Sequence, residues 1–230
     1  MAFTYAFARP ALTVDCVVFG FRDQQLVVLL IERGEQPFAG KWALPGGFVH
    51  DDETLDGAAE RELVEEAGLR ISYLEQLYTF GALDRDPRER VVTVAYVALV
   101  NPAQHELRAS TDARRAAWFD VRERPALAFD HEAIVEQALE RLRSKVRYRP
   151  IGFGLLDDTF TLTELQKLYE VIVGRALDKR NFRKKILKLG LIVPTDQKER
   201  GVPRRAARFF TFDRGRYDAL TESGFDLELI

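Results

Sequence analysis

Residues 47 to 69 read GFVHDDETLDGAAERELVEEAGL, the stretch with the strongest local pattern in this chain. Within it, Leu55, Ala59 and Leu63 recur every four residues and form an apolar stripe. This spacing predicts an amphipathic helix from about residue 54 to residue 67, with its apolar face packed on a core.

The residues that flank the stripe predict where this helix begins and ends. Asp51 and Asp52 are expected to cap its N-terminus. Gly68 follows the stripe, at the position where helices commonly end in left-handed backbone. Arg61 is expected to pair with Glu53 across the junction between the loop and the helix.

Three carboxylates of the predicted helix, Glu62, Glu65 and Glu66, stand at positions i, i+3 and i+4. This spacing places them on one face, where like charges repel one another. A divalent cation turns that repulsion into coordination, and Mg²⁺ binds a few carboxylates together with substrate phosphates. The alternative is a solvated acidic helix face, and the spacing alone leaves both interpretations open.

The complete pattern resembles the Nudix box at every fixed position: Gly47, Glu53, Arg61-Glu62-Leu63, Glu65-Glu66 and Gly68-Leu69. The resemblance implies a Nudix fold, an α/β/α sandwich with a mixed sheet, and a site for a nucleoside diphosphate linked to another moiety. In active family members, the positions that match Glu62, Glu65 and Glu66 bind divalent metal. If the chain is catalytic, the resemblance makes the following its catalytic residues: Glu53, Arg61, Glu62, Glu65 and Glu66.

Charge is unevenly distributed along the 230 residues. The formal net charge is −2, but residues 1–120 hold 12 Lys and Arg against 19 Asp and Glu, whereas residues 175–216 hold 14 against 4. An acidic front and a basic rear favour different partners for the two parts. No run approaches 18 apolar residues and the N-terminus lacks a basic and then apolar pattern, so we expect no membrane span, no signal peptide and a cytoplasmic location. The single cysteine, Cys16, is expected to be reduced and in the core.

The front half also predicts a sheet. Its β-branched and apolar runs predict a hairpin at 11–31 and further strands at 71–81, 91–100 and 113–121. Residues 41–47 hold a proline followed by two glycines, which lets the backbone approach a ligand closely. Trp42 and Phe38 lie in or near this turn and are candidates for stacking on a base. The alternative is that both are ordinary core aromatics.

The segment Asp84-Arg85-Asp86-Pro87-Arg88-Glu89-Arg90 predicts a tight polar loop between two strands. Guanidinium groups make bidentate contacts with phosphate oxygens, so Arg85 and Arg88 are candidate ligand-binding residues. The alternative is a solvated hairpin turn.

The rear of the chain predicts a second domain. A long amphipathic helix is predicted at residues 130–147, and a connector with proline and glycine follows it at residues 148–160. We place the boundary at this point, with residues 1–148 as a Nudix domain with a trailing helix and residues 149–230 as the second domain.

The second domain has the element order of a winged helix-turn-helix. Thr161 and Glu164 stand at capping-box spacing before a predicted helix at 162–173, and Asp178 precedes a second one at 179–189. Two short strands around a polar loop follow and predict a β-hairpin. Helix, turn, basic helix and hairpin in this order are typical of DNA-binding winged helices, and the whole chain is expected to be of class α+β.

Basic residues gather on the second predicted helix and on the hairpin. A cationic surface of this kind favours phosphates through counterion release, and Arg180 and Asn181 are suitable types for reading guanine and adenine edges. The alternative is a small helical cap with a solvated basic face. The candidate DNA-binding residues are Lys179, Arg180, Asn181, Arg183, Lys184, Arg204, Arg205 and Arg208.

A Nudix domain followed by a winged helix is similar to the Nudix-related transcriptional regulators of NAD metabolism. The stretches that carry this resemblance include Asp84-Arg85-Asp86-Pro87-Arg88, Phe129-Asp130-His131, Leu139-Glu140-Arg141-Leu142-Arg143, Leu165-Gln166-Lys167-Leu168-Tyr169-Glu170 and Arg180-Asn181-Phe182-Arg183-Lys184-Lys185. The family implies a homodimeric repressor that binds a palindromic double-stranded DNA operator and senses ADP-ribose or a related derivative in the Nudix pocket. In many members the box is degraded and hydrolysis is lost, whereas here the box is intact.

Two functions of different classes follow from these patterns. The leading hypothesis is a transcriptional repressor of NAD metabolism genes that responds to ADP-ribose. The rival is a Mg²⁺-dependent ADP-ribose pyrophosphatase, in which Glu62, Glu65 and Glu66 hold the metal. RNA binding is disfavoured because the sequence shows no aromatic stacking strip.

Overall fold

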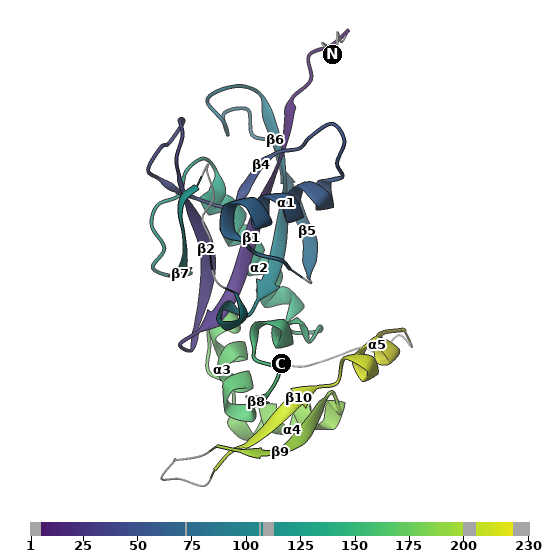
Figure 1. Cartoon of the computed structure of the whole chain (residues 1–230). Helices are drawn as coiled ribbons and strands as arrows, with labels where there is room; N and C mark the ends of the chain where they lie inside the picture. Colours follow the sequence, from purple (N-terminus) through teal and green to yellow (C-terminus); the bar gives the residue numbers. More distant parts are fainter. Residues whose placement is uncertain (1–5, 72, 106, 108–112, 200–205, 223–230) are drawn as a thin grey trace. The chain divides into compact units, whose positions relative to one another are not determined.

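The computed structural model describes residues 6–71, 73–105, 107, 113–199 and 206–222 (Figure 1). Two compact units share the chain: one comprises Met1–Gly20, Val27–Val100 and Gln104–Ala138, and the other comprises Phe21–Leu26, Asn101–Ala103 and Leu139–Ile230. We call them the first and second units. In the described ranges, no helix is both long and apolar enough to cross a membrane.

The first unit is built on a mixed sheet, as predicted. Its strands are β1 (Ala11–Arg22), β2 (Gln25–Arg33), β3 (Trp42–Ala43), β4 (Gly46–Phe48), β5 (Leu74–Phe80), β6 (Val91–Val100) and β7 (Ala113–Asp120). The order is β3-β2-β1-β6-β5, with β4 on β1 and β7 on β2. Strands β1 and β6 run parallel, whereas the pairs β1–β4, β2–β3, β2–β7 and β5–β6 run antiparallel. The predicted hairpin is confirmed: β1 and β2 join at Asp23 and Gln24, which both have positive φ as tight hairpin turns require.

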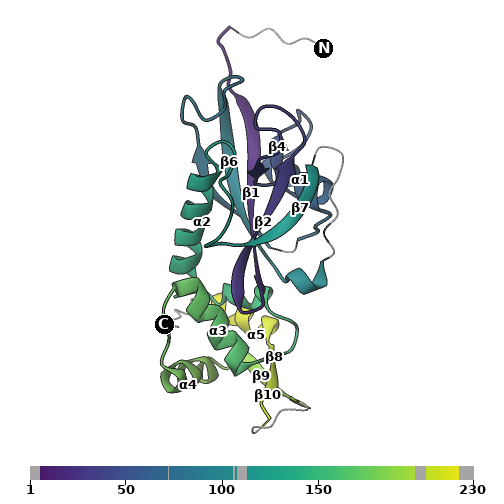
Figure 2. The same cartoon turned by 90° about the vertical axis from the view of Figure 1, so that its left-hand side faces the viewer.

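Helices cover both faces of this sheet. Helix α1 (Leu55–Ala67) lies on one face, and the first part of helix α2 (His131–Lys145) lies on the other (Figure 2). Under α1, Val14, Cys16 and Tyr96 of the sheet pack against Ala59 and Leu63 of the helix in one buried cluster. This is the α/β/α sandwich that the sequence predicts, with Cys16 free and buried in the core.

The ends of α1 correct one detail of the sequence analysis. The N-cap is Thr54, whose hydroxyl accepts a hydrogen bond from the backbone N–H of Gly57 at 3.1 Å. The prediction that Asp51 or Asp52 caps the helix is therefore wrong. A cap must directly precede the first turn to reach its free N–H groups, and these two residues lie too early in the chain. At the other end Gly68 has φ +70°, as predicted.

The second unit contains a helix pair and a small sheet. Its elements are the 3-10 helix η2 (Ile151–Leu155), β8 (Phe160–Thr161), α3 (Leu162–Val173), α4 (Lys179–Leu189), β9 (Ile192–Lys198), β10 (Arg208–Phe212) and α5 (Arg214–Glu222). A further 3-10 helix, η1, spans Pro102–Gln104. The sheet order is β8-β10-β9, and both pairs are antiparallel. This confirms the predicted winged helix-turn-helix.

Local signals define the helix pair as predicted. Thr161 and Glu164 form a complete capping box, with each side chain accepting the other residue's backbone N–H. Gly174 and Gly190 end α3 and α4 in left-handed backbone. The two helices pack through Tyr169 and Phe182, whose ring centroids lie 5.5 Å apart.

Gly46 sits where β4 meets β1, and no side chain fits there. A Cβ on Gly46 would lie 2.2 Å from the carbonyl oxygen of Val14, which belongs to the central strand. We predict that Gly46→Ala lowers the free energy of unfolding by about 1–3 kcal/mol or more, because the backbone must shift to relieve the overlap. Urea unfolding measures this.

Gly81→Ala is the matched control. Its Cβ would meet its nearest neighbour, a methyl group of Val92, at 3.6 Å, which is ordinary contact. This variant should stay within about 0.5 kcal/mol of wild type. Equal losses in the two variants would contradict the steric explanation.

Candidate functional site

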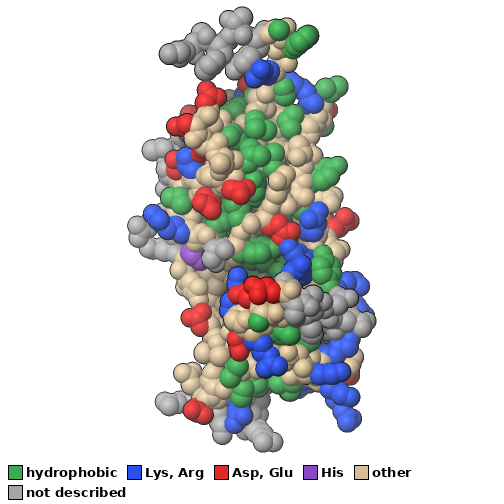
Figure 3. Space-filling view, turned by 90° about the vertical axis from the view of Figure 1, so that its right-hand side faces the viewer, with side chains coloured by type: hydrophobic (Ala, Val, Ile, Leu, Met, Phe, Trp, Pro, Cys, Tyr) green, Lys and Arg blue, Asp and Glu red, His purple; other side chains and the backbone are tan. Residues whose placement is uncertain are grey.

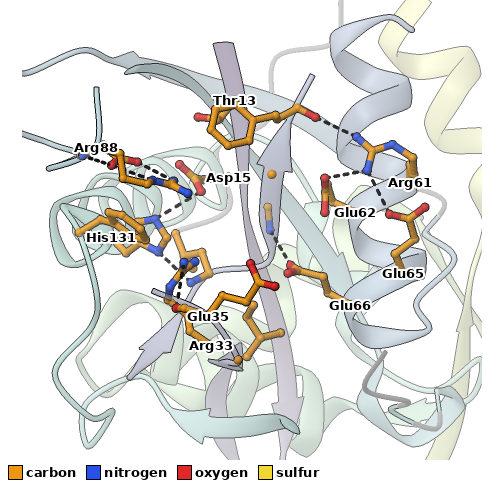
Figure 4. A pocket seen from close by; sticks show the side chains of 18 of the residues that line it. Thr13, Asp15, Arg33, Glu35, Arg61, Glu62, Glu65, Glu66, Arg88 and His131 are labelled. Carbon is orange, nitrogen blue, oxygen red and sulfur yellow. Dashed lines mark hydrogen bonds and ion pairs between the residues drawn. The ribbon is translucent and has the colours of Figure 1, made fainter. Parts of the chain in front are cut away.

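The first unit carries a pocket of about 360 Å³ between α1 and the loops at one end of the sheet (Figure 4). Acidic side chains from α1 form one wall, and Arg33, Arg88 and His131 lie opposite them. A volume of this size suits a small ligand. The basic wall suits an anionic group of a ligand, and the acidic wall suits a cation that is bound together with that ligand.

Arg61 organises the acidic wall. Its guanidinium makes a bidentate pair with Glu53 at 3.0 and 2.7 Å and also contacts Glu62 at 2.7 Å and Glu65 at 3.1 Å. The predicted Arg61–Glu53 pair is therefore confirmed. Hydrogen bonds from Arg61 and from the backbone of His50 lower the pKa of Glu53 to about 2.

Glu62 and Glu66 are nearly buried, and burial raises the pKa of both carboxyls. For Glu66 the value reaches about 8, with burial and the neighbouring Glu62 and Asp15 outweighing a hydrogen bond from the Gly46 N–H at 2.8 Å. Glu65 is more exposed, with 55% of its side chain accessible. These are hard oxygen donors of the kind that Mg²⁺ prefers. Yet among the described residues no three acidic, histidine or cysteine side chains converge as a metal-ligating group, since Glu62 and Glu65 turn to Arg61 and Glu66 to Gly46.

Arg85 forms a buried ion-pair cluster on the opposite wall. Its guanidinium binds both oxygens of Asp130 at 3.0 and 2.9 Å and one oxygen of Asp15 at 3.0 Å. Only 4% of its side chain is exposed. Burial alone would raise the pKa of Asp15, but His131 and Arg85 together lower it to about 2.

His131 completes this cluster, and its tautomer follows from its contacts. Its Nδ1 accepts a hydrogen bond from the backbone N–H of Leu44 at 2.9 Å, so Nδ1 carries no proton. Its Nε2 lies 3.3 Å from Asp15 and donates to that carboxylate. His131 therefore links the loop before β4 to strand β1.

Arg88 and Arg33 are guanidinium groups that line the pocket and remain partly exposed. Arg88 is 41% exposed and pairs with the buried Asp86 at 2.8 Å. It lies 5.9 Å from the ring centroid of Phe129, and Arg33 lies 4.8 Å from the same ring. Arg88 also lies 5.4 Å from the ring of Phe48. Phe129 has φ +53°, a strained backbone for a bulky residue, which the contacts of its neighbours hold in place.

The second unit presents an exposed cationic helix. On α4, Lys179, Arg180, Asn181 and Lys184 are exposed, and Phe182 and Ile186 face the core. Figure 3 shows Lys and Arg side chains gathered over this unit on the face drawn there. Arg183, another candidate DNA-binding residue, is half-buried and donates to the Thr163 hydroxyl of α3 at 3.0 Å.

The turn between α3 and α4 is held by side chains of α3. Glu170 accepts a hydrogen bond from the Leu177 N–H at 3.0 Å, and Gln166 donates to the Leu177 carbonyl at 3.1 Å. Gln166 and Glu170 also bond each other at 3.0 Å. This fixes the start of α4, the helix that would enter a DNA groove.

Comparison with known proteins identifies a family for each unit, the one with the pocket and the one with the basic helix. The NUDIX domain family matches residues 9–141, and the family described as NrtR DNA-binding winged helix domain matches residues 152–212. The ADPR responsive transcriptional repressor NtrR of Acinetobacter baylyi is 38% identical over 92% of this chain and 86% of its own length. The chain belongs to the NrtR family of Nudix-related transcriptional regulators.

Solved structures of relatives extend this assignment. Shewanella oneidensis NrtR complexed with a 27mer DNA matches 90% of this chain and 95% of its own, at 36% identity and a TM-score of 0.77. The NUDIX domain of the same protein complexed with ADP ribose matches 60% of this chain and 91% of its own, at 41% identity and a TM-score of 0.56. An ADP-ribose pyrophosphatase of Methanocaldococcus jannaschii is also 38% identical, over 56% of this chain and 73% of its own length.

In the structure of this chain, the site residues predicted from the sequence fall into three groups. Those that line the pocket are Arg61, Glu62, Glu65, Glu66, Arg85 and Arg88. Glu53 lies behind Arg61, Trp42 packs on Phe119, and Phe38 packs on Phe129, so these three do not line the pocket. Arg208 on β10 is exposed, whereas Arg204 and Arg205 lie outside the described residues.

Sequence reasoning missed several pocket residues. Asp15, Arg33, Phe48, Phe129 and His131 received no site role, although Phe129-Asp130-His131 was among the stretches that resemble the family. The family motif Phe129-Asp130-His131 could have indicated Phe129 and His131. For Asp15, the local signal was an acidic residue within the apolar strand β1.

The depressed pKa of Asp15 predicts a pH dependence of stability. Its folded pKa of about 2 lies below the ordinary value of 3.8, so its contribution is fully present well above pH 4 and is lost as the pH falls towards 2. Asp15→Asn should therefore be less stable than wild type at pH 7, and this difference should shrink by about 1 kcal/mol by pH 3.

Urea unfolding at pH 7, 5 and 3 measures that difference. Asp23→Asn is the control, because Asp23 is exposed in the hairpin turn and Asn tolerates its positive φ. Its difference from wild type should stay near zero throughout. A constant deficit of Asp15→Asn at every pH would contradict the assigned ion pairs.

Proposed function

We propose that this chain is a DNA-binding transcriptional repressor of NAD metabolism genes that senses ADP-ribose or a related nucleoside diphosphate derivative. The observation that carries this is the presence, in one chain, of a pocket with cationic and anionic walls and of a winged helix with an exposed basic helix. Residues 1–148 hold the ligand and residues 149–230 bind DNA. We place the protein in the cytoplasm.

The pocket offers each part of ADP-ribose a suitable partner. Arg88 and Arg33 face the pocket and bind the diphosphate, because guanidinium groups match phosphate oxygens. Phe129 and Phe48 offer ring faces to an aromatic base or to the ribose. Arg85 is buried and paired with two carboxylates, so it supports the wall and contributes charge to it. Relatives that respond to or bind ADP-ribose support this ligand class.

The winged helix binds its operator through α4. Arg180 and Asn181 stand at its N-terminal end and read base edges, and Lys179, Arg183 and Lys184 support them. Arg204, Arg205 and Arg208 contact the phosphate backbone from the hairpin. The active form is a homodimer on a palindromic double-stranded site, because two-fold protein symmetry matches two half-sites about one helical turn apart.

Fluorescence anisotropy of the full chain on operator DNA tests the function. ADP-ribose should change the Kd for the operator by roughly 5- to 150-fold, since effectors act through coupling energies of that range. ADP, which lacks the second ribose, is the matched ligand control. A protein without sequence preference, or one whose operator affinity ignores ADP-ribose, would refute the proposal.

Variants separate base reading from phosphate contact. Arg180→Ala and Asn181→Ala should each reduce the preference for the operator over random DNA, by about 1–3 kcal/mol in discrimination. Arg208→Ala should weaken both DNAs alike and lower the salt slope by about 1. Titrations of the two DNAs at two or three salt concentrations distinguish these outcomes. If both classes of variant behave alike, the division of roles is wrong.

A second candidate function is Mg²⁺-dependent ADP-ribose hydrolysis. It is favoured by the intact box, whose Glu62, Glu65 and Glu66 all line the pocket. These three carboxylates would hold Mg²⁺, which when bound supplies charge neutralisation for the diphosphate. Arg61 would then hold the Glu53 carboxylate in position beside the acidic wall, and the Gly46 N–H would keep Glu66 oriented.

The double variant Glu65→Gln/Glu66→Gln tests this activity. If the chain hydrolyses ADP-ribose, removing two carboxylates should lower turnover with Mg²⁺ by at least about 100-fold, as loss of positioned charge stabilisation does. Release of AMP and ribose phosphate is measured by chromatography. A wild-type rate no faster than that of the double variant would leave regulation as the sole function of the pocket.

A further inference from the structure

The residues that begin helix α2 are bound into the wall of the ligand pocket. Asp130, directly before α2, accepts hydrogen bonds from the Nε and Nη2 of Arg85. His131, the first residue of α2, bridges Leu44 and Asp15. We call Asp15, Arg85, Asp130 and His131 the clasp. It ties the helix start to strand β1 and to the loops at Arg85 and Leu44.

Helix α2 then continues, unbroken, into the second unit. Its residues up to Ala138 belong to the first unit and those from Leu139 to the second, within one 15-residue helix of roughly 22 Å. Leu139 and Leu142 are buried, and the Arg143 Nε donates to the carbonyl of Ile172 at 3.3 Å. Ile172 lies at the end of α3, one helix before α4, which we propose to read DNA. Helix α2 thus begins among the residues of the pocket wall, and its last turn contacts α3 of the helix-turn-helix.

The clasp is adjacent to the arginine that a phosphate would reach. Arg85 and Asp86 are neighbours in sequence, and Asp86 holds Arg88 through three hydrogen bonds of 2.8 to 3.0 Å. An anion that draws Arg88 away leaves Asp86 as a buried carboxylate with fewer partners. The charges of Arg85 and Arg33 also act on Asp86, and both remain when Arg88 is drawn away. Asp86 then competes with Asp15 and Asp130 for Arg85.

We propose that the clasp is the coupling element of this regulator: occupancy of Arg88 by a ligand phosphate redistributes the partners of Arg85, and α2 carries the change to the helix-turn-helix. This inference rests on the proposed function. It makes Arg85, Asp130 and Arg143 positioning residues, whose loss uncouples ligand from DNA while each is still bound. A residue that merely stabilised the fold would not separate those quantities.

The test is a coupling measurement on the full chain. Anisotropy gives the Kd for operator DNA with and without saturating ADP-ribose, and calorimetry gives the Kd for ADP-ribose. In Asp130→Asn and in Arg143→Met, the ratio of the two DNA affinities should fall to within about 2-fold of one, from the roughly 5- to 150-fold expected of an effector. Each separate Kd should stay within about 3-fold of wild type.

Charge-matched controls lie on the same segment. Glu140→Gln and Arg147→Met remove one charge each from exposed positions on or just after α2, and both should keep the wild-type ratio. If Asp130→Asn does not fold, Arg143→Met decides, because it leaves the buried clasp intact.

Three outcomes overturn the inference. In the first, Asp130→Asn and Arg143→Met keep the wild-type ratio of DNA affinities with and without ADP-ribose. In the second, the control variants lose that ratio equally. In the third, Asp130→Asn loses ADP-ribose binding itself, which would place the Arg85–Asp130 pair in the ligand site. A wild type that binds DNA and ADP-ribose independently instead contradicts the proposed function, so the two failures are distinct.

Discussion

Carboxylates that are nearly buried face one pocket in the first unit: Asp15, Glu62, Glu66 and Asp86. Burying a charge is costly unless a partner compensates for it, and removing one partner of a buried pair typically costs about 3–5 kcal/mol. The arrangement of arginines around this pocket follows from that constraint. Arg61 pairs with Glu62, Arg85 with Asp15, and Arg88 with Asp86. Glu66 instead accepts a hydrogen bond from the Gly46 N–H.

The three arginines are therefore not equivalent, although they look alike in sequence. Arg61 and Arg85 are enclosed by the acids that they neutralise, and Arg88 keeps a large exposed fraction. An incoming anion meets Arg88 first, and its effect reaches the enclosed groups through Asp86. A pocket built this way responds to a diphosphate by rearranging ion pairs, which couples binding to structure.

The second unit solves a simpler problem, which is to present a cationic helix in a fixed orientation. Apolar residues at helical spacing bury one face of α4, and the Gln166–Glu170–Leu177 contacts fix its start. The charged face is left to solvent and to phosphate. Counterion release rewards such a face on any DNA, so the few residues at the helix start must supply sequence preference.

Elements whose cause lies within a few residues were predictable from the sequence. The helix at α1, the capping box at Thr161, the hairpin turn and the helix end at Gly68 all stand where local spacing placed them. The one misplaced cap, at Asp51 and Asp52, differs by only two or three residues from Thr54, because several adjacent residue types can cap a helix. The Nudix box and the basic helix likewise depend on local spacing.

The partners across the pocket were beyond such reasoning. Arg85 pairs with a residue 70 positions earlier and another 45 positions later, and Leu44 bonds His131 at a separation of 87. Local pattern assigned Arg85 and Arg88 the same role, and chain folding separated them by enclosing one and exposing the other. Spacing in the sequence thus determined which residue types and elements are present. Burial determined which charged groups pair with one another and which remain available to a ligand. The reason is that the free-energy cost of an unpaired charge depends on its surroundings in the fold and not on its neighbours in the chain.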